Sequence, residues 1–293
     1  MLNNPIRVAL IGAPNVGKSS LLNALVGEKT SIVTGLAGTT RDQIRGFVDN
    51  LEISDTPGIM QGDRVLEKHM RKSISNAVQS ADIIVYVVDA GLIDFSDLQK
   101  ITNYQSKQIP IIVAVNKIDK TPRVILLAGL EKLAKLYFVS AVVPVSAKTG
   151  AQIGTLLDEI KKACPQGTPS ESLADDTYTD QTVRQMSAEI IRESIIKNTR
   201  DEIPHGVAVI ITQFTESSKS TEIHADIVCE KQSHKPIIIG HGGAMLKKIG
   251  IQARIEIEKL TGTSAKLYTH VIVRPDWKDD KDLLSRSPHV GHH

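Results

Sequence analysis

The chain has 293 residues, of which 41% are hydrophobic and 23% are charged, and its formal net charge is +2. These values are typical of packed globular proteins with one large or two ordinary domains, and the small net charge indicates no particular partner. The longest apolar runs, such as Ile83–Val88, span only five or six residues, whereas a membrane-crossing helix needs about 20. The sequence therefore predicts no transmembrane segment.

The N-terminus lacks the charged start and long apolar stretch of a signal peptide, and Cys164 and Cys229 have no metal-ligand spacing. This combination favours a cytoplasmic protein with reduced thiols. The last residues, Gly291-His292-His293, resemble the remnant of an expression tag and end a predicted tail over 287–293.

Residues 1–163 alternate short apolar strands with longer helical stretches, which predicts a three-layer α/β domain with a mostly parallel sheet. Asp49-Asn50 predicts a two-residue hairpin between the second and third strands. The predicted strands are Ile6–Ile11, Ile44–Val48, Leu51–Ser54, Ile83–Val88, Ile111–Val115 and Val142–Val145. Predicted helices follow Gly17 and cover Leu66–Gln79, Ser96–Gln108, Val124–Leu136 and Ala151–Ala163.

Residues 164–179 are rich in Pro, Gly, Ser, Thr and Asp and predict a linker. Residues 180–286 then predict a smaller α+β domain in the order helix, strand, strand, helix, strand, with a glycine-rich turn before the second helix. Its predicted elements are Gln181–Thr199, Gly206–Phe214, Thr221–Glu230, Ala244–Leu260 and Ala265–Val273.

The segment after the first predicted strand matches the phosphate-binding pattern G-x-x-x-x-G-K-[ST] without a mismatch and opens a helix. Its glycines let backbone N–H groups surround phosphates at a helix N-terminus. Lys18 is predicted to reach the β- and γ-phosphates, and Ser19 to bind Mg²⁺. A chance glycine turn is the alternative, which the strand–loop–helix context disfavours. The predicted loop comprises Gly12, Ala13, Pro14, Asn15, Val16, Gly17, Lys18, Ser19 and Ser20.

Two further segments are candidates for the same site. Asp55-Thr56-Pro57-Gly58 ends a strand expected beside the first one, where Asp55 suits Mg²⁺ and the Gly58 N–H suits the γ-phosphate. Gly38-Thr39-Thr40-Arg41-Asp42 lies in a stretch with few apolar residues, and a threonine hydroxyl that binds Mg²⁺ only beside a γ-phosphate would make it a switch loop. An ordinary turn and a polar loop are the respective alternatives.

Asn116-Lys117-Ile118-Asp119 follows a buried strand, at the sheet edge where α/β proteins bind ligands. The Asp119 carboxylate only accepts hydrogen bonds and matches the N1–H and 2-amino donors of guanine, which adenine does not offer. The Lys117 stem suits the base plane, Asn116 can tie this loop to the phosphate loop, and Ser146-Ala147-Lys148 can offer the Ala147 N–H to guanine O6. Together with the phosphate loop, these segments predict a guanine-nucleotide site.

The second domain contains a G-x-x-G loop of the kind that lets a nucleic-acid backbone approach closely, as in KH modules. Residues 231–255 include five basic residues and no acidic one, which supports RNA binding. The alternative is a glycine-rich turn beside a solvated basic helix face. The predicted RNA-binding residues are Lys235, Ile237, Ile238, Gly240, His241, Gly242, Gly243, Lys247 and Lys248.

With these motifs in place, the chain resembles the Era family of bacterial GTPases from Ile6 to about Trp277. The resemblance rests on GAPNVGKSS, TTRD, DTPG, NKID and VSAKTG, and above all on EIPHGVAV and IIIGHGGAMLKKIG. It implies a P-loop GTPase domain followed by a type II KH domain that binds the 3′ region of 16S rRNA and assists 30S assembly. It also implies a monomeric, cytoplasmic protein with peripheral association at the inner membrane.

Carried over by position, the resemblance makes Lys18, Thr40 and Gly58 the predicted catalytic groups, with Thr40 rather than Thr39 as the switch threonine. Mg²⁺ is then held by Ser19, Thr40 and Asp55, and Asn15 is a candidate ligand for K⁺. Ile59 stands where Ras-like proteins keep a glutamine that orients water. We therefore predict slow intrinsic hydrolysis that a partner stimulates.

The chain departs from the family pattern in three places. The hairpin between Thr40 and Asp55 is shorter than the family pattern leads us to expect, His241 replaces a common lysine in the G-x-x-G loop, and the tail from Lys278 to Asp282 is acidic-leaning. Two other functions stay open: an RNA-binding factor with negligible GTP turnover, and a GTPase whose second domain docks on protein or membrane.

Overall fold

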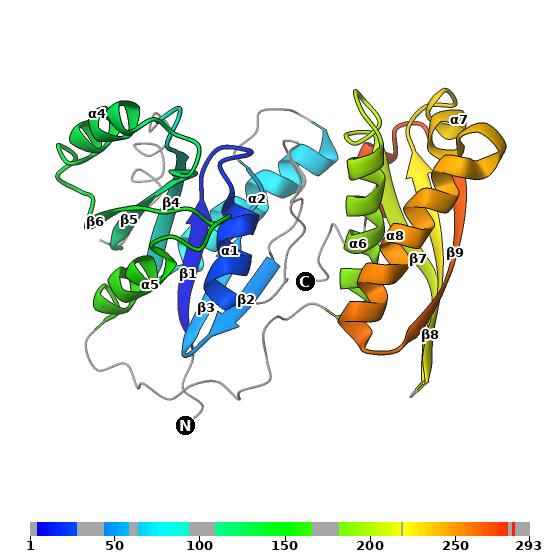
Figure 1. The fold of residues 1–293 in the computed structure, drawn as a ribbon, viewed down its shortest axis with the longest axis horizontal. Coiled ribbons are helices and arrows are strands. Elements are labelled where there is room, and N and C mark those ends of the chain that lie inside the picture. Colours follow the sequence, from blue (N-terminus) through cyan, green and yellow to red (C-terminus); the bar gives the residue numbers. More distant parts are fainter. Residues whose placement is uncertain are drawn as a thin grey trace. The chain divides into compact units, whose positions relative to one another are not determined.

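The structure is a computed structural model that describes residues 5–27, 44–58, 64–93, 109–165, 182–217, 219–280 and 283–284. The chain divides into two compact units (Figure 1). Strands β1–β6, within residues 6–144, belong to the first unit, and the elements from α6 to β9, within residues 183–273, belong to the second.

The first unit is built on a six-stranded sheet in the order β2-β3-β1-β4-β5-β6. All neighbouring strands pair in parallel except β2 and β3, which form the hairpin predicted at Asp49-Asn50. The strands are β1 (Ile6–Ile11), β2 (Ile44–Val48), β3 (Leu51–Asp55), β4 (Ile83–Asp89), β5 (Ile111–Asn116) and β6 (Ala141–Pro144). The strands lie within two residues of the predicted ranges.

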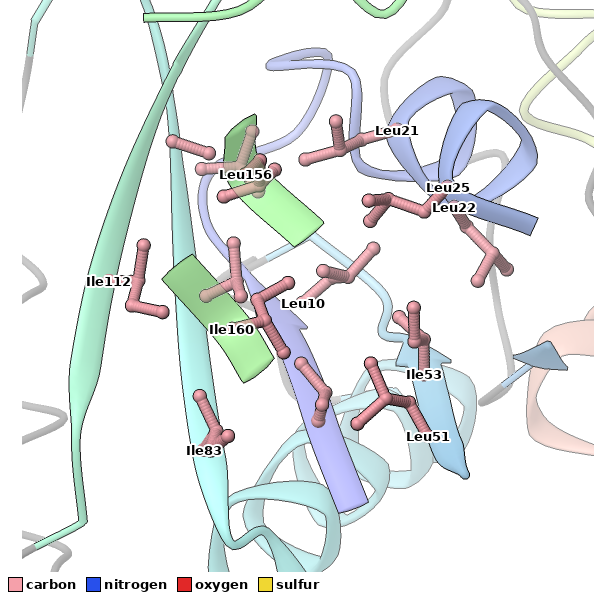
Figure 2. Packing of buried hydrophobic residues seen from close by; sticks show 14 of the residues in the cluster. Leu10, Leu21, Leu22, Leu25, Leu51, Ile53, Ile83, Ile112, Leu156 and Ile160 are labelled. Carbon is pink, nitrogen blue, oxygen red and sulfur yellow. The ribbon is translucent and has the colours of Figure 1, made fainter. Parts of the chain in front are cut away.

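Helices cover both faces of this sheet because its strands are apolar on both sides. Leu21 and Leu22 of α1 and Leu156 and Ile160 of α5 pack around Leu10 of β1 on one face (Figure 2). On the other face, side chains of α2 and α4 pack against the alternate residues of β4 and β5. The described helices are α1 (Lys18–Val26), α2 (Val65–Ser80), α4 (Arg123–Leu133) and α5 (Ile153–Lys162). The predicted helix Ser96–Gln108 lies outside the described residues.

The second unit has a three-stranded sheet in the order β7-β8-β9, with β7 and β8 antiparallel and β8 and β9 parallel. Its helices α6 and α8 lie side by side over one face of that sheet (Figure 1). The elements are α6 (Val183–Asn198), β7 (Val207–Glu216), β8 (Ser220–Cys229), α7 (His234–Ile239), α8 (Ala244–Thr261) and β9 (Ser264–Val273). This is the α+β arrangement of a KH domain.

The predicted element order of the second unit is wrong by one helix, because α7 precedes the glycine-rich turn. Six residues are too few to display helical periodicity, and Pro236 argues superficially against a helix. Pro236 nevertheless lies in the first turn of α7, where a missing N–H leaves no intrahelical hydrogen bond unmade. The turn between α7 and α8 is a short 3₁₀ segment, η1 (His241–Gly243).

The two cysteines are free thiols, and burial raises the pKa of both Cys164 and Cys229. After β9, Trp277 in the 3₁₀ turn η2 (Trp277–Asp279) is fully buried, and its Nε1 donates to the Gly206 carbonyl at 3.2 Å. Among the described residues, no helix is long and apolar enough to span a membrane. The predicted linker lies outside the described residues from 166 onward, as does the tail over 287–293.

Candidate functional sites

The loop between β1 and α1 depends on glycine at two positions. A Cβ on Gly12 would lie 2.3 Å from the Val87 carbonyl oxygen, and a Cβ on Gly17 would lie 2.3 Å from the Asn116 Nδ2. Both glycines also have positive φ, 153° and 99°, and Gly17 is the N-cap of α1. The loop is therefore shaped so that the backbone itself, rather than side chains, faces a ligand at the start of α1.

Lys18 is held inside this loop. Its Nζ donates to the carbonyls of Gly12 at 3.0 Å and Ala13 at 2.9 Å, and the residue is only 5% exposed. Burial lowers the pKa of Lys18 to about 8, and the nearby Asp55 carboxylate opposes part of that shift. A phosphate that entered the loop would supply the negative charge that favours the ammonium form.

Asp55 and Ser19 meet at the base of the loop, with Ser19 Oγ donating to Asp55 Oδ2 at 2.6 Å. Asp55 reaches this position because β3 pairs with β1, opposite Leu10. A hydroxyl and a carboxylate are oxygen ligands of the type that Mg²⁺ prefers. The chemistry of this pair therefore fits the predicted magnesium ligands.

The rest of the D-T-P-G segment packs against the first strand and the loop. Thr56 is buried and its Oγ1 donates to the Leu10 carbonyl at 2.8 Å, so its side chain joins β3 to β1 instead of facing a ligand. A Cβ on Gly58 would lie 2.7 Å from Pro14 Cα. Glycine at this position lets the segment lie directly beside the phosphate loop.

Asn116 ties the predicted guanine motif to the phosphate loop, as the sequence suggests. Its Nδ2 donates to the Val16 carbonyl at 2.9 Å, and its Oδ1 accepts from the backbone N–H groups of Lys117 at 2.8 Å and Ala147 at 3.0 Å. The residue is 1% exposed. In this geometry the Ala147 N–H, which the sequence assigns to guanine O6, is directed to Asn116.

Asp119 lies exposed at the same edge of the sheet and accepts a hydrogen bond from Ser146 Oγ at 2.7 Å. That hydrogen bond, with smaller contributions that include the charges of Lys120 and Lys148, lowers the pKa of Asp119. The carboxylate is thus kept ionised and able to accept hydrogen bonds from a donor pair. Ile118, between these polar residues, packs partly into the core.

Lys117 extends back across the phosphate loop, where its Nζ donates to the Asn15 carbonyl and forms an ion pair with Asp89. The sequence alone does not identify Asp89 as part of this site. It has no local motif, and only the pairing of β4 with β5, which sets Asp89 opposite Asn116, brings it to the site.

The predicted switch loop Gly38–Asp42, including Thr39, Thr40 and Arg41, lies outside the described residues, as does Ile59.

In the second unit, the G-x-x-G loop lies between α7 and α8. Gly240, Gly242 and Gly243 have φ of 73°, 56° and 81°, and added Cβ atoms on Gly242 and Gly243 would meet nothing within 4 Å. The loop surface is therefore open, and glycine is needed for its backbone conformation. His241, Lys247 and Lys248 are exposed around it, whereas Lys235 is half-buried.

Ile238 is a correction to the predicted RNA-binding residues. It is 0% exposed and belongs to the core beneath α7, whereas its neighbour Ile237 is 52% exposed. The sequence cannot separate the two because the face that a six-residue helix buries is set by tertiary packing.

Comparisons with known proteins cover both units. The family described as 50S ribosome-binding GTPase matches residues 7–117, and the KH domain family matches residues 202–278. The GTPase Era of Ruminiclostridium cellulolyticum is 38% identical over 286 residues, covering 94% of each chain. The GTPase Era of Bordetella pertussis is 39% identical over 283 residues, covering 94% of this chain and 95% of the relative.

Two solved structures are similar over nearly the whole chain. One is Era in complex with MgGDPNP and nucleotides 1506–1542 of 16S ribosomal RNA, with a TM-score of 0.90, 34% identity and coverage of 97% of this chain and 98% of that one. The other is an Aquifex aeolicus Era variant bound to GDP·AlF4⁻, with a TM-score of 0.89, 34% identity and coverage of 97% and 99%.

Proposed function

This chain belongs to the Era family of GTPases, and we propose that it is a GTP-dependent switch that binds the 3′ region of 16S rRNA through its KH domain and assists assembly and maturation of the small ribosomal subunit. The observation that carries the proposal is the similarity, at a TM-score of 0.90 over 97% of this chain, to Era bound to MgGDPNP and 16S rRNA nucleotides. We place the GTPase domain at 1–163, the linker at 164–179 and the KH domain at 180–286.

In the proposed reaction, water attacks the γ-phosphate of GTP and the products are GDP and phosphate. The chain contributes mainly positioning and charge. Lys18 moves from the Gly12 and Ala13 carbonyls to the β- and γ-phosphates. Ser19, Thr40 and Asp55 would hold Mg²⁺, which would neutralise charge on the phosphates. Asn15 is the candidate ligand for K⁺.

Base selection comes from Asp119. Its ionised carboxylate accepts from N1–H and the 2-amino group of guanine, and Ser146 Oγ orients it by donating to its Oδ1 at 2.7 Å. An adenine base would leave the carboxylate without these donors, which disfavours ATP.

RNA contact comes from the open loop of the second unit. Exposed Lys247 and Lys248 follow the G-x-x-G turn on α8 and can meet phosphates, and Gly242 and Gly243 present backbone without side chains. We further propose a cytoplasmic monomer with peripheral contact to the inner membrane, in line with the family resemblance.

We expect the purified full chain to release phosphate from GTP slowly, because Ile59 supplies no side chain that can orient water. RNA that ends with the 3′ region of 16S rRNA should clearly accelerate this release. Phosphate release is measured with and without this RNA, in K⁺ and in Na⁺, and Lys18→Ala serves as the inactive control. Fast release without RNA or K⁺ would contradict the switch. Tight RNA binding with no detectable release in any condition would favour the RNA-binding factor with negligible turnover.

A further inference from the structure

The carboxylate of Asp89 lies beside the candidate guanine site although no motif includes it. Asp89 is the last residue of β4 and pairs with Asn116 at the end of β5. Its Oδ2 is 2.7 Å from the Nζ of Lys117, the second residue of the guanine motif. The pair therefore joins β4 directly to the residue whose stem is expected along the base.

Lys117 is fixed at both of its ends by this arrangement. Its backbone N–H donates to Asn116 Oδ1 at 2.8 Å, and its Nζ donates to the Asn15 carbonyl as well as to Asp89. Between these points, Lys117 Cε lies 3.9 Å from the position that a Cβ on Gly17 would take. The aliphatic stem thus passes close to the phosphate loop, and the ammonium group contacts the Asn15 carbonyl and Asp89.

Asp89 is itself held in one orientation. Its Oδ1 accepts from the Gly91 N–H at 2.9 Å, and its carbonyl accepts from the Leu92 N–H at 3.0 Å. The next residue, Ala90, donates its N–H to the Asn116 carbonyl at 2.8 Å. One carboxylate oxygen therefore closes the turn after β4, and the other is presented to Lys117.

We propose that Asp89 is a positioning residue for the purine base of GTP and GDP. By holding the Lys117 ammonium, it keeps the Lys117 stem in place as the apolar surface against which the base lies. The inference rests on the proposed assignment of Asn116–Asp119 as the guanine site. Its consequence is that Asp89 affects the nucleoside part of binding and leaves phosphate recognition unchanged.

If Asp89 only closed the turn after β4, its substitution would have a different effect. Asp89→Asn retains an oxygen that can accept from the Gly91 N–H but removes the charge that pairs with Lys117. A turn-closing residue would tolerate this change, whereas a residue that acts through Lys117 would not. Asp158→Asn is the matched control, because it removes the same charge from an exposed position on α5.

The test uses the full chain with Mg²⁺ and measures the dissociation rate of fluorescently labelled GDP. The Asp89–Lys117 pair is about one-third exposed on both sides, so we expect Asp89→Asn to accelerate dissociation about three- to fivefold and not more. Asp158→Asn should match the wild type. In a Lys117→Ala background, Asp89→Asn should add no further acceleration, because the residue through which it acts is gone. The KM for GTP should rise while kcat stays unchanged.

A second ligand separates base from phosphate. Inorganic tripolyphosphate, which has no base, should compete for the phosphate loop equally well in the wild type and in Asp89→Asn. The inference is overturned if Asp89→Asn behaves like Asp158→Asn, if tripolyphosphate binding weakens as much as GDP binding, or if the effect persists in full without Lys117. If Asp119→Ala also left GDP dissociation unchanged, the guanine assignment itself would fail. A strong Asp119→Ala effect beside a silent Asp89→Asn would reject only the present inference.

Discussion

Replacing Gly17 with alanine would place a methyl group 2.3 Å from Asn116 Nδ2, at a residue whose φ is 99°. Two penalties follow from this geometry. An alanine in left-handed backbone conformation costs about 1–2 kcal/mol. Relief of the contact requires Asn116 to move, which breaks its hydrogen bond to the Val16 carbonyl and leaves buried polar groups without partners, at about 1–3 kcal/mol.

The sum predicts that Gly17→Ala lowers the free energy of unfolding by about 2–5 kcal/mol. Gly27 provides a matched control at the other end of α1. It also has positive φ, 82°, but a Cβ there would meet nothing within 4 Å. Gly27→Ala therefore carries only the backbone penalty of about 1–2 kcal/mol.

Urea unfolding of both full-length variants without nucleotide, followed by circular dichroism, measures this difference. Labelled GDP should also dissociate much faster from Gly17→Ala than from Gly27→Ala, because Asn116 joins the guanine motif to the phosphate loop. Equal destabilisation of the two variants, with equal GDP dissociation, would show that close packing of Gly17 against Asn116 contributes neither to stability nor to GDP binding.

Burial lowers the pKa of Lys18 to about 8, so GDP binding above pH 8 should take up a proton and weaken by about tenfold per pH unit, as calorimetry in two buffers would detect. Between pH 8 and the pKa of an unfolded lysine, Lys18 carries a proton in the unfolded chain but not in the folded one. The free energy of unfolding of the nucleotide-free chain should therefore increase as pH rises through this range. Ser146→Ala removes the hydrogen bond that is the main cause of the lowered pKa of Asp119. The Asp119 carboxylate should then become protonated at a higher pH than in the wild type, and GDP affinity should be lost at that higher pH. Lys247→Glu with Lys248→Glu should weaken RNA binding and reduce its salt slope by about one per lysine lost, in a titration at several salt concentrations; an unchanged affinity would favour docking on protein or membrane.

The arrangement of the candidate nucleotide-site residues was predictable because their motifs are local and each follows a strand. A glycine loop between β1 and α1 can place Lys18 and Ser19 in only one region, and a parallel sheet brings the ends of β3 and β5 to the same edge. Spacing and strand order together therefore suffice to bring Asp55 near Ser19, and the structure contains this contact at 2.6 Å.

Features that depend on tertiary pairing were not predictable. Asp89 reaches Lys117 because β4 pairs in register with β5, and an aspartate at a strand end carries no signal of that register. The sequence does not predict helix α7 because six residues that include Pro236 show no helical periodicity of apolar side chains. It also places Ile238 on the RNA surface, because only packing against the rest of the domain decides which side of so short a helix is buried. The sequence favours the base as the partner of the Ala147 N–H, whereas in the structure this N–H donates to Asn116 Oδ1 at 3.0 Å.

We propose that guanine nucleotide and ribosomal RNA bind to one switch. The most direct test is a titration of the full chain with RNA containing the 3′ region of 16S rRNA, at stated salt, in the presence of either a non-hydrolysable GTP analogue with Mg²⁺ or GDP with Mg²⁺. We predict tighter binding with the GTP analogue and a clear preference over an RNA of the same length and scrambled sequence. Equal affinity in both nucleotide states, together with equal affinity for the scrambled RNA, would show that the chain is not a nucleotide-dependent switch for this RNA.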